Sequence, residues 1–452
     1  MFPSVIEKVV NHDLCIGCGI CVPSCKSKSL KMSFNADLGM QIPEQINDCN
    51  LEGDCLKVCP FNPIPEESVK SEDKIIENLN LEVHSNNKHF GRYKSITAGF
   101  SKEYQKTSSS GGVATWLLHE LLNKNVVDAV IVVEKSNSTN SHYEYKVLDG
   151  IEGLTKASKT KYYPLSLDKI IFEIKKSDKR FAITAIPCFL KAIRLKQFYD
   201  ADLKQKITFC IGIFCGGLKT SLYTDYLSSR CGVEKENIKN PEYRIKNELG
   251  TAIDYSFGVE NQSTNELKKI KMKEVGDMWG TGLFKPTACE FCDDLSSELA
   301  DISLGDAWIP PYDKDGRGAN IVITRSNLAE ELIKSGIRSE ELVLDPINEG
   351  QAERSQRGNI NHRRKGLAFR LFLAKLSKKR SVISEKRISP KILLSPIFIL
   401  VLLQRNKVRT NSFKYWNKYK NAKDFDKAME KSKFLLRIFT KVNSKLRFDK
   451  KQ

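Results

Sequence analysis

Seven cysteines within the first 60 residues constrain the fold of this chain more than any other feature. Four stand in "CIGCGICVPSC" at 15–25 and three in "CNLEGDCLKVCP" at 49–60. The first motif has the spacing C-x2-C-x2-C-x3-C, in which three thiolates bind one iron–sulfur cluster and the fourth reaches a second cluster. Its two glycines let the backbone wrap closely around a cluster.

This spacing predicts a ferredoxin-type domain with two 4Fe–4S clusters. The first cluster is expected to take Cys15, Cys18, Cys21 and Cys59. The second is expected to take Cys25, Cys49 and Cys55. Cys-x2-Cys pairs also hold zinc, but so many thiolates, with Pro60 after the last, favour iron and sulfur.

Two positions depart from the bacterial ferredoxin pattern. Lys26 follows Cys25 where proline is usual, and Glu52 stands where a cysteine would complete the second motif. A carboxylate is a hard ligand at a site that prefers soft sulfur. The prediction is therefore a 3Fe–4S cluster, or a 4Fe–4S cluster with one labile iron; in the alternative, Glu52 faces solvent and the second cluster is absent.

Charge and length limit the class of protein. The 452 residues allow roughly two to four domains. The net charge of +18 comes from the last 92 residues, which hold 27 Lys plus Arg against 5 Asp plus Glu, a net charge of +22, whereas residues 1–360 carry −4. We predict no signal peptide, and the longest apolar run, 392–403, is too short to cross a bilayer. Thirteen cysteines without an export signal favour thiolate chemistry in the reducing cytosol.

Composition predicts a mixed α+β and α/β, multidomain chain. The ferredoxin-like domain is expected over 1–65 and a polar linker with about one helical turn over 66–92. Short β-branched runs at 126–133, 180–187, 206–215 and 300–308 alternate with helical stretches and indicate an α/β body. We divide the body at 93–175 and 176–350, followed by a basic helical tail over 351–452.

The body offers a candidate anion site. Ser110, Gly111 and Gly112 precede a predicted helix, whose free N–H groups attract anions, although Ser-Gly before a helix is more often only a cap. Downstream, "KTKYY" supplies basic and aromatic side chains able to clamp a pyrophosphate or to form a solvated loop. The residues concerned there are Lys159, Lys161, Tyr162 and Tyr163.

Four cysteines of the body stand at turns or strand ends: Cys188, Cys215, Cys289 and Cys292. A Pro-Cys turn, a Cys-Gly-Gly turn and a Cys-x2-Cys pair together exceed what core packing needs, so they indicate a third cluster. Cys210 and Cys231 are expected to be core residues, and the six histidines receive no role.

The segments "SSSGGVATWLLHELL", "AIPCFLKAIR", "FCGG" and "ACEFCDDLSSELADISLGDAW" together resemble the coenzyme F420 hydrogenase/dehydrogenase beta-subunit family, preceded by a two-cluster ferredoxin module. The resemblance implies an iron–sulfur flavoprotein that binds FAD near residues 110–112 and Thr115. It also implies that the four body cysteines hold a 4Fe–4S cluster and that Asp306 lies nearby. Members linked to surface-polysaccharide synthesis also belong to the family, so the substrate stays open.

The expected function is an oxidoreductase that passes electrons between a ferredoxin-like partner, the clusters, FAD and an organic substrate. The alternatives are a non-catalytic electron-transfer subunit of a larger complex and a cluster-bearing binding protein. Catalytic residues are unknown; Lys161, Tyr163, Arg244 and Asp306 are acid–base candidates only by their placement near the motifs.

The tail mixes basic and apolar residues at helical spacing, most clearly over 363–380 and 402–420. Such a segment suits the surface of an anionic membrane, which predicts peripheral association at the inner face of the membrane. The alternatives are packing on the body or on a partner and, less favoured, nucleic acid, for which no binding motif is present.

Overall fold

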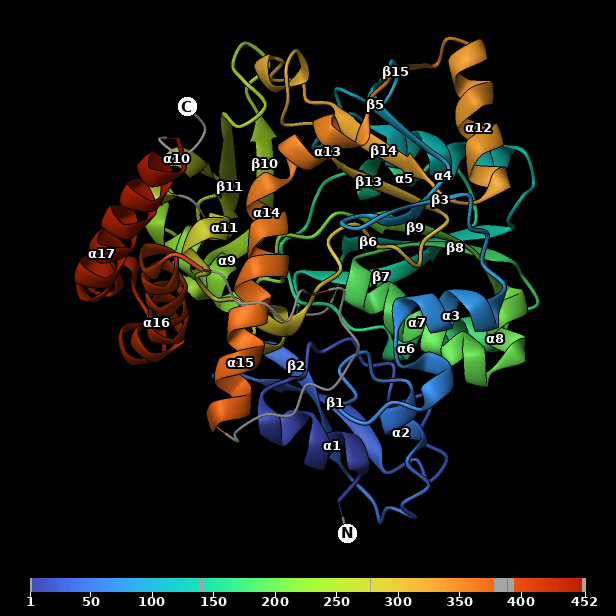
Figure 1. Cartoon of the computed structure of the whole chain (residues 1–452), viewed down its shortest axis with the longest axis horizontal. Coiled ribbons are helices and arrows are strands. Elements are labelled where there is room, and N and C mark those ends of the chain that lie inside the picture. Colours follow the sequence, from blue (N-terminus) through green and yellow to red (C-terminus); the bar gives the residue numbers. More distant parts are fainter. Residues whose placement is uncertain (1, 138–140, 277, 378–387, 389–393, 449–452) are drawn as a thin grey trace.

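The computed structural model describes the chain except for residues 1, 138–140, 277, 378–387, 389–393 and 449–452. A small N-terminal region, a body around a large sheet and a C-terminal helical region are visible in Figure 1. The predicted mixture of α and β structure is confirmed.

The central sheet has eight strands in the order β15-β5-β14-β13-β9-β8-β6-β7. Strands β6, β8, β9 and β13 run parallel to one another, and the outer strands are antiparallel to their neighbours. In this order the strands are Leu342–Pro346, Ser95–Ser101, Asn320–Thr324, Ile302–Asp306, Ile207–Ile213, Phe181–Ala185, Ala129–Lys135 and Tyr143–Leu148.

Both faces of this sheet are covered, which explains why its parallel strands are continuous apolar runs. Val130 and Val132 point to one face, beneath α4 (Val113–Asn123), α5 (Leu154–Ala157) and α12 (Asn327–Arg338). Ala129 and Ile131 point to the other, against α6 (Asp168–Lys175) and α7 (Pro187–Tyr199), which α8 (Ala201–Lys206) follows. The alternation follows from the two-residue period of a strand.

The N-terminal region consists of α1 (Ser4–Lys8), the turn η1 (Val10–His12), the hairpin β1 (Leu30–Asn35)–β2 (Met40–Gln45) and α2 (Asp54–Lys57). It packs directly on the body: the Leu167 amide donates to the Cys18 carbonyl at 2.8 Å. Gly19 has a φ of +75°, and a Cβ atom there would lie 2.1 Å from Ser166 Oγ. This glycine therefore also permits close contact between the cysteine motif and the body.

Residues 66–92 are more structured than the polar composition predicted. They form η2 (Glu67–Val69), α3 (Glu72–Leu79) and the hairpin β3 (Ser85–Asn87)–β4 (Gly91–Tyr93). Ile75, Ile76 and Leu79 are buried in the same core as α7. The expected linker with a single helical turn was wrong, because three apolar residues at helical spacing suffice to bind this stretch to the body.

A second, three-stranded sheet, β10-β11-β12, stands beside the body. Its strands are Ile238–Lys246, Tyr255–Asn261 and Leu267–Lys271, preceded by α9 (Ser221–Arg230) and η3 (Lys235–Asn237) and followed by α10 (Met272–Val275) and α11 (Met278–Thr281). Helices α16 (Pro396–Tyr419) and α17 (Ala422–Phe448) form a hairpin against this unit. Trp416 and Phe425 pack there on Tyr226 and Phe284, with ring centroids 4.9–6.0 Å apart.

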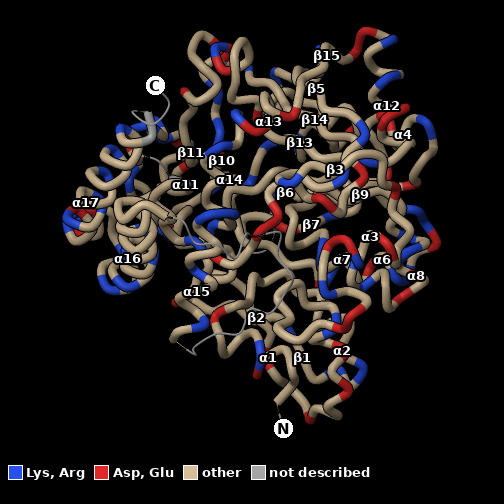
Figure 2. The backbone as a smooth tube through the Cα atoms, viewed as in Figure 1, with Lys and Arg blue, Asp and Glu red and all other residues tan. Residues whose placement is uncertain are grey.

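The C-terminal region is thus part of the core on one side and basic on the other. Figure 2 marks the positions of Lys and Arg in blue along the backbone of α16 and α17. Between the body and this hairpin run α13 (Glu349–Ser355), α14 (Arg357–Asn361), a π-helical turn η6 (His362–Gly366) and α15 (Leu367–Ser377). Among the described helices, none combines the length and the apolar character needed to cross a membrane.

Candidate functional site

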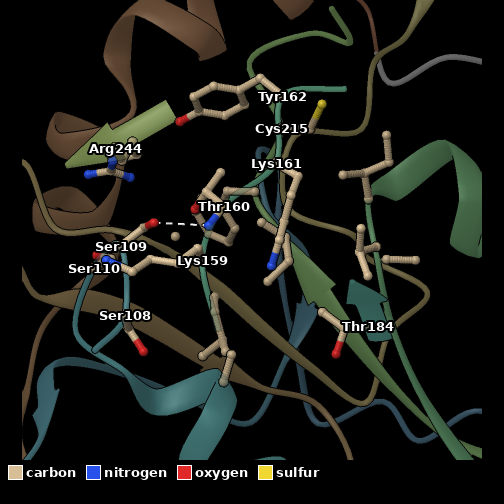
Figure 3. Close-up of a pocket in the computed structure, with 18 of the residues that line it drawn as sticks. Ser108, Ser109, Ser110, Lys159, Thr160, Lys161, Tyr162, Thr184, Cys215 and Arg244 are labelled. Carbon is tan, nitrogen blue, oxygen red and sulfur yellow. Dashed lines mark hydrogen bonds between the residues drawn. The ribbon is translucent and has the colours of Figure 1, made fainter. Parts of the chain in front are cut away.

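A cavity of ≈ 290 Å³ opens where the parallel strands of the central sheet end. Its lining includes Val133 of β6, Thr184 of β8, Ile213 of β9 and Asp306 of β13, each at or near the carboxyl end of its strand. In open α/β sheets this edge is where ligands bind. Figure 3 shows the serine turn, the lysine-rich loop and Cys215 around this cavity.

The serine turn before α4 lines one wall. The Ser109 hydroxyl accepts a hydrogen bond from the Thr160 amide at 2.9 Å, the contact dashed in Figure 3, and the Ser110 hydroxyl donates to the Ala319 carbonyl at 2.9 Å. Gly112 has a φ of +80° and lines the cavity.

Gly111 has a different role from the one that the sequence suggested. A Cβ atom there would lie 2.6 Å from the Gly99 carbonyl oxygen and 2.7 Å from the Asn320 amide. This glycine is needed for packing of the turn on β5 and β14, and it is not among the residues that line the cavity. The other eight predicted cofactor residues do line it: Ser110, Gly112, Thr115, Lys159, Lys161, Tyr162, Tyr163 and Asp306.

The loop over 159–163 brings two lysines to the cavity. Lys159 pairs with Glu242 at 3.0 Å. The Lys161 ammonium donates to the Ala157 carbonyl at 2.6 Å, and burial lowers the pKa of this lysine to about 7. Its charge is therefore poorly solvated, and an anion in the cavity would stabilise it.

Arg244 and Asp306 form a buried ion pair at the same cavity. One Arg244 Nη atom donates to both carboxylate oxygens, at 2.9 and 2.8 Å. The guanidinium also lies over the Tyr255 ring, 4.9 Å from its centroid. Burial alone would lower the pKa of Arg244, but Asp306, Tyr162 and Tyr255 outweigh it, so this cation is permanent. The structure offers no evidence for Arg244 as a proton donor.

Three side chains of the lining carry buried polar atoms that have no hydrogen-bond partner in the described structure: Thr184 Oγ1, Arg244 Nε and Trp308 Nε1. An unsatisfied buried polar group costs about 1–3 kcal/mol, so such groups normally face a ligand or water. Sequence reasoning missed Thr184 and Trp308. Both residues stand near the ends of predicted strands, but this position indicates a place at the cavity only when the order of the strands in the sheet is known.

The seven N-terminal cysteines form two adjacent groups. Burial raises the pKa of the Cys21 thiol well above its usual value, and the neighbouring thiols of Cys18, Cys15 and Cys59 raise it further. Burial likewise raises the pKa of Cys55, which interacts with Cys25 and Cys49. The thiols of Cys15, Cys18, Cys59 and also Cys55 thus lie near Cys21, and their division into two cluster sites stays a prediction.

The Glu52 carboxylate contacts other polar side chains, which does not favour its binding to a cluster. Its carboxylate accepts a hydrogen bond from the Asn50 side chain at 2.7 Å and lies 3.5 Å from the Lys26 ammonium. The two departures from the ferredoxin pattern are thus ion-pair partners of each other. Among the described residues, no group of three or more His, Cys, Asp or Glu side chains has an arrangement that could hold a single metal ion.

The four body cysteines form a third group. Burial raises the pKa of the Cys188 thiol, and the thiols of Cys292, Cys215, Cys289 and Cys18 raise it further. Cys18 belongs to the first N-terminal group, so the two groups are neighbours. Cys215 also lines the cavity. A set of four thiols is the soft donor set that iron–sulfur clusters require. Cys210 is fully buried, as expected for a core residue.

Comparison with known proteins finds relatives among coenzyme F420 enzymes. A subunit of the F(420)H(2) dehydrogenase of Methanosarcina mazei is 24% identical over 370 residues, which cover 80% of this chain and 94% of that protein. The beta subunit of coenzyme F420 hydrogenase from Methanothermobacter thermautotrophicus is 26% identical over 269 residues, or 57% and 86% of the two chains. A chain of the F420-reducing NiFe hydrogenase complex from Methanosarcina barkeri shares the fold, with a TM-score of 0.50, 19% identity, and coverage of 67% of this chain and 99% of that one.

Family models account for most of the chain up to residue 350. A 4Fe-4S binding domain matches residues 8–30. The N-terminal and C-terminal models of the coenzyme F420 hydrogenase/dehydrogenase beta subunit match residues 96–171 and 178–350. The chain therefore belongs to the coenzyme F420 hydrogenase/dehydrogenase beta-subunit family and carries a 4Fe-4S binding domain at its N-terminal end.

Proposed function

We propose that this chain is an iron–sulfur flavoprotein oxidoreductase that passes electrons between a ferredoxin-like partner and an organic substrate. One observation carries the proposal: the body cysteine group interacts with the first N-terminal group through Cys18 and reaches the cavity through Cys215. The first N-terminal cysteine group, the body cysteine group and the ligand cavity are thus neighbours in space, in that order.

The three cysteine groups are the proposed cluster sites. The first site uses Cys15, Cys18, Cys21 and Cys59, the second Cys25, Cys49 and Cys55, and the third Cys188, Cys215, Cys289 and Cys292. Iron–sulfur clusters supply single-electron transfer, whereas a flavin exchanges either one or two electrons with its substrate. Because Glu52 is engaged by Asn50 and Lys26, the second site is proposed to hold a 3Fe–4S cluster.

The cavity is the proposed FAD site. Lys159 and Lys161 flank Thr160, whose amide is bonded to the serine turn, and there they would hold a pyrophosphate, while Phe189 and Leu118 supply apolar walls that exclude water. The unpartnered atoms of Thr184, Arg244 and Trp308 would satisfy the polar edge of a ring system. The relatives named for coenzyme F420 support that carrier as the organic substrate. Surface-polysaccharide synthesis stays a prediction from the family resemblance.

Iron and flavin content test the proposal. The anaerobically purified chain is expected to hold one FAD and about eleven iron atoms, from two 4Fe–4S clusters and one 3Fe–4S cluster. A count of about twelve would mean that the second cluster keeps its fourth iron. Cys188→Ser should remove about four iron atoms. Cys231→Ser, at a half-buried cysteine outside all three groups, is the matched control and should remove none. A protein with roughly seven iron atoms and no flavin would refute the enzyme proposal.

A non-catalytic role within a larger complex is the second candidate. It is favoured by the relatives' names, which describe subunits of hydrogenase and dehydrogenase. Reduction of the bound flavin by added ferredoxin without turnover of coenzyme F420 or small acceptors would support this role, whereas steady turnover by the isolated chain would refute it.

A surface on α17 supports peripheral membrane binding. Phe434, Ile438 and Val442 follow one another at four-residue intervals and are 53%, 39% and 40% exposed. Every charged residue over 431–448 is basic. We propose that this row meets an anionic bilayer, where each nearby basic residue contributes about 1 kcal/mol.

Sedimentation with anionic vesicles at low salt tests membrane binding. Phe434→Glu together with Ile438→Glu should abolish it, while Asp424→Asn, at an exposed position at the other end of α17, should not. Unchanged sedimentation of the double variant would exclude this surface.

A further inference from the structure

Four arginines of the C-terminal region bind the loop that carries Cys289 and Cys292. The "arginine strap" is Arg363, Arg364, Arg370 and Arg409. Arg364 donates to the Asp293 carbonyl at 2.7 Å, Arg370 to the Glu290 carbonyl at 2.7 Å, and Arg409 to the Thr287 hydroxyl at 3.1 Å. The strap lies beyond residue 350, where the match to the family models ends. It is therefore a feature of this chain outside the matched region.

Arg363 joins two separate loops of the third cysteine group. Its two Nη atoms donate to the Cys292 carbonyl at 3.2 Å and to the Cys215 carbonyl at 2.6 Å. The side chain stands on the π-helical turn η6 and is only 2% exposed. A planar guanidinium with several donors can bridge two carbonyls at fixed geometry, which a lysine ammonium does less precisely.

The same guanidinium also has a donor atom that makes no hydrogen bond in the described structure. This atom, Arg363 Nε, is buried. A buried donor without a partner beside a set of thiols fits a sulfur acceptor.

The neighbouring charges are already paired elsewhere. Lys285 forms an ion pair with Glu290, whose carboxylate also forms an ion pair with Arg370 at 3.2 Å. The Asp294 carboxylate accepts from the amides of Ser296 and Glu298, at 2.9 and 3.0 Å. Within the described residues, no carboxylate forms an ion pair with Arg363. Arg363 therefore lies beside the cysteine group without an ion-pair partner of its own, and Asp294 is a neighbouring carboxylate whose charge also acts on it.

We propose that Arg363 is a positioning residue for the third cluster: it fixes the Cys215 loop against the Cys289–Cys292 loop and raises the cluster's reduction potential by placing a buried cation beside it. The inference rests on the proposed function, because it requires a cluster at these four cysteines. The direction follows from electrostatics, since reduction adds negative charge, which a nearby cation stabilises.

The test is an anaerobic redox titration of the full-length protein, followed by electron paramagnetic resonance, on Arg363→Gln and Arg363→Lys. We expect Arg363→Gln to shift the third cluster's reduction equilibrium at least tenfold toward the oxidised form, a drop of about 59 mV for a one-electron couple. Arg363→Lys should keep most of the potential. The matched control is Arg357→Gln, an exposed arginine of α14.

The outcomes separate the two proposals. A lowered potential at the third cluster alone supports the inference. So does loss of about four iron atoms in Arg363→Gln but not in Arg363→Lys, because it shows that the charge holds the site. If both variants match the unaltered protein in iron content and potential, the inference is refuted while the proposed function stands. If the unaltered protein lacks the third cluster, the proposed function itself fails.

Discussion

The low pKa of Lys161 leads to a quantitative prediction about flavin binding. Burial lowers this pKa to about 7; Lys159 and Lys135 also lower it, while Glu134 and Glu242 raise it. In flavin-depleted protein we therefore expect this lysine to be about half protonated at pH 7, about one part in eleven at pH 8 and about one part in a hundred at pH 9. A pyrophosphate requires the protonated form.

The affinity for FAD should follow that protonated fraction. We expect Kd to rise about fivefold from pH 7 to pH 8 and about tenfold from pH 8 to pH 9. The assay is anaerobic titration calorimetry of flavin-depleted protein with FAD, in two buffers of different ionisation enthalpy. At pH 8 binding should take up close to one proton, because the anion restores the charge of Lys161.

Two substitutions isolate this lysine. Lys161→Gln should bind FAD weakly and without this pH dependence, whereas Lys161→Arg, which stays charged, should bind without pH dependence and with retained affinity. Lys156→Gln, at an exposed lysine of the preceding helix, is the control. If Lys161→Gln keeps the full pH dependence, the assignment of the pyrophosphate to Lys161 is refuted, and Lys246, with a pKa of about 8, becomes the group to test.

Three further outcomes are expected. Glu52→Cys should raise the iron content from about eleven to about twelve atoms and remove any 3Fe–4S resonance signal. Gly111→Ala should lower the thermal unfolding midpoint and weaken FAD binding, because the new methyl would lie 2.6 Å from a backbone carbonyl. Phe425→Ala should destabilise the fold by about 3–5 kcal/mol, seen as a lower denaturation midpoint, whereas Phe434→Ala on the exposed face should change it little.

Local spacing was sufficient to predict the N-terminal cysteine groups. A cluster's ligands repeat at short intervals, so the neighbours of Cys21 and Cys55 could be expected before any fold was known, while their assignment to two clusters stays a prediction. Lys161, Ser110 and Gly112, which stand in short motifs, line the cavity as predicted, whereas Gly111 does not, and binding of FAD there stays a prediction. Thr184 and Trp308 could not be assigned, because each is a single residue at a strand end whose neighbours depend on pairing between distant strands.

The tail shows a different limit of sequence reasoning. Apolar residues at helical spacing between basic ones do not reveal which side of a helix meets protein. In α17, Phe425 packs on Tyr226 and Phe284 while Phe434 stays exposed. The strap was missed for a related reason: Arg363 belongs to a basic run, and its contacts with Cys215 and Cys292 exist only in the folded chain.

The strand order has a consequence for synthesis of the chain. Strand β5 begins at Ser95 but pairs only with β14 and β15, the latter ending at Pro346. At a translation rate of roughly 5–20 residues per second, β5 waits roughly 10–50 s for its partners. Cys188 is likewise made long before Arg363. The contacts of Arg363 with the Cys215 and Cys292 carbonyls can therefore form only after all four cysteines of the third group have been made, so this group is expected to form before the arginine fixes it.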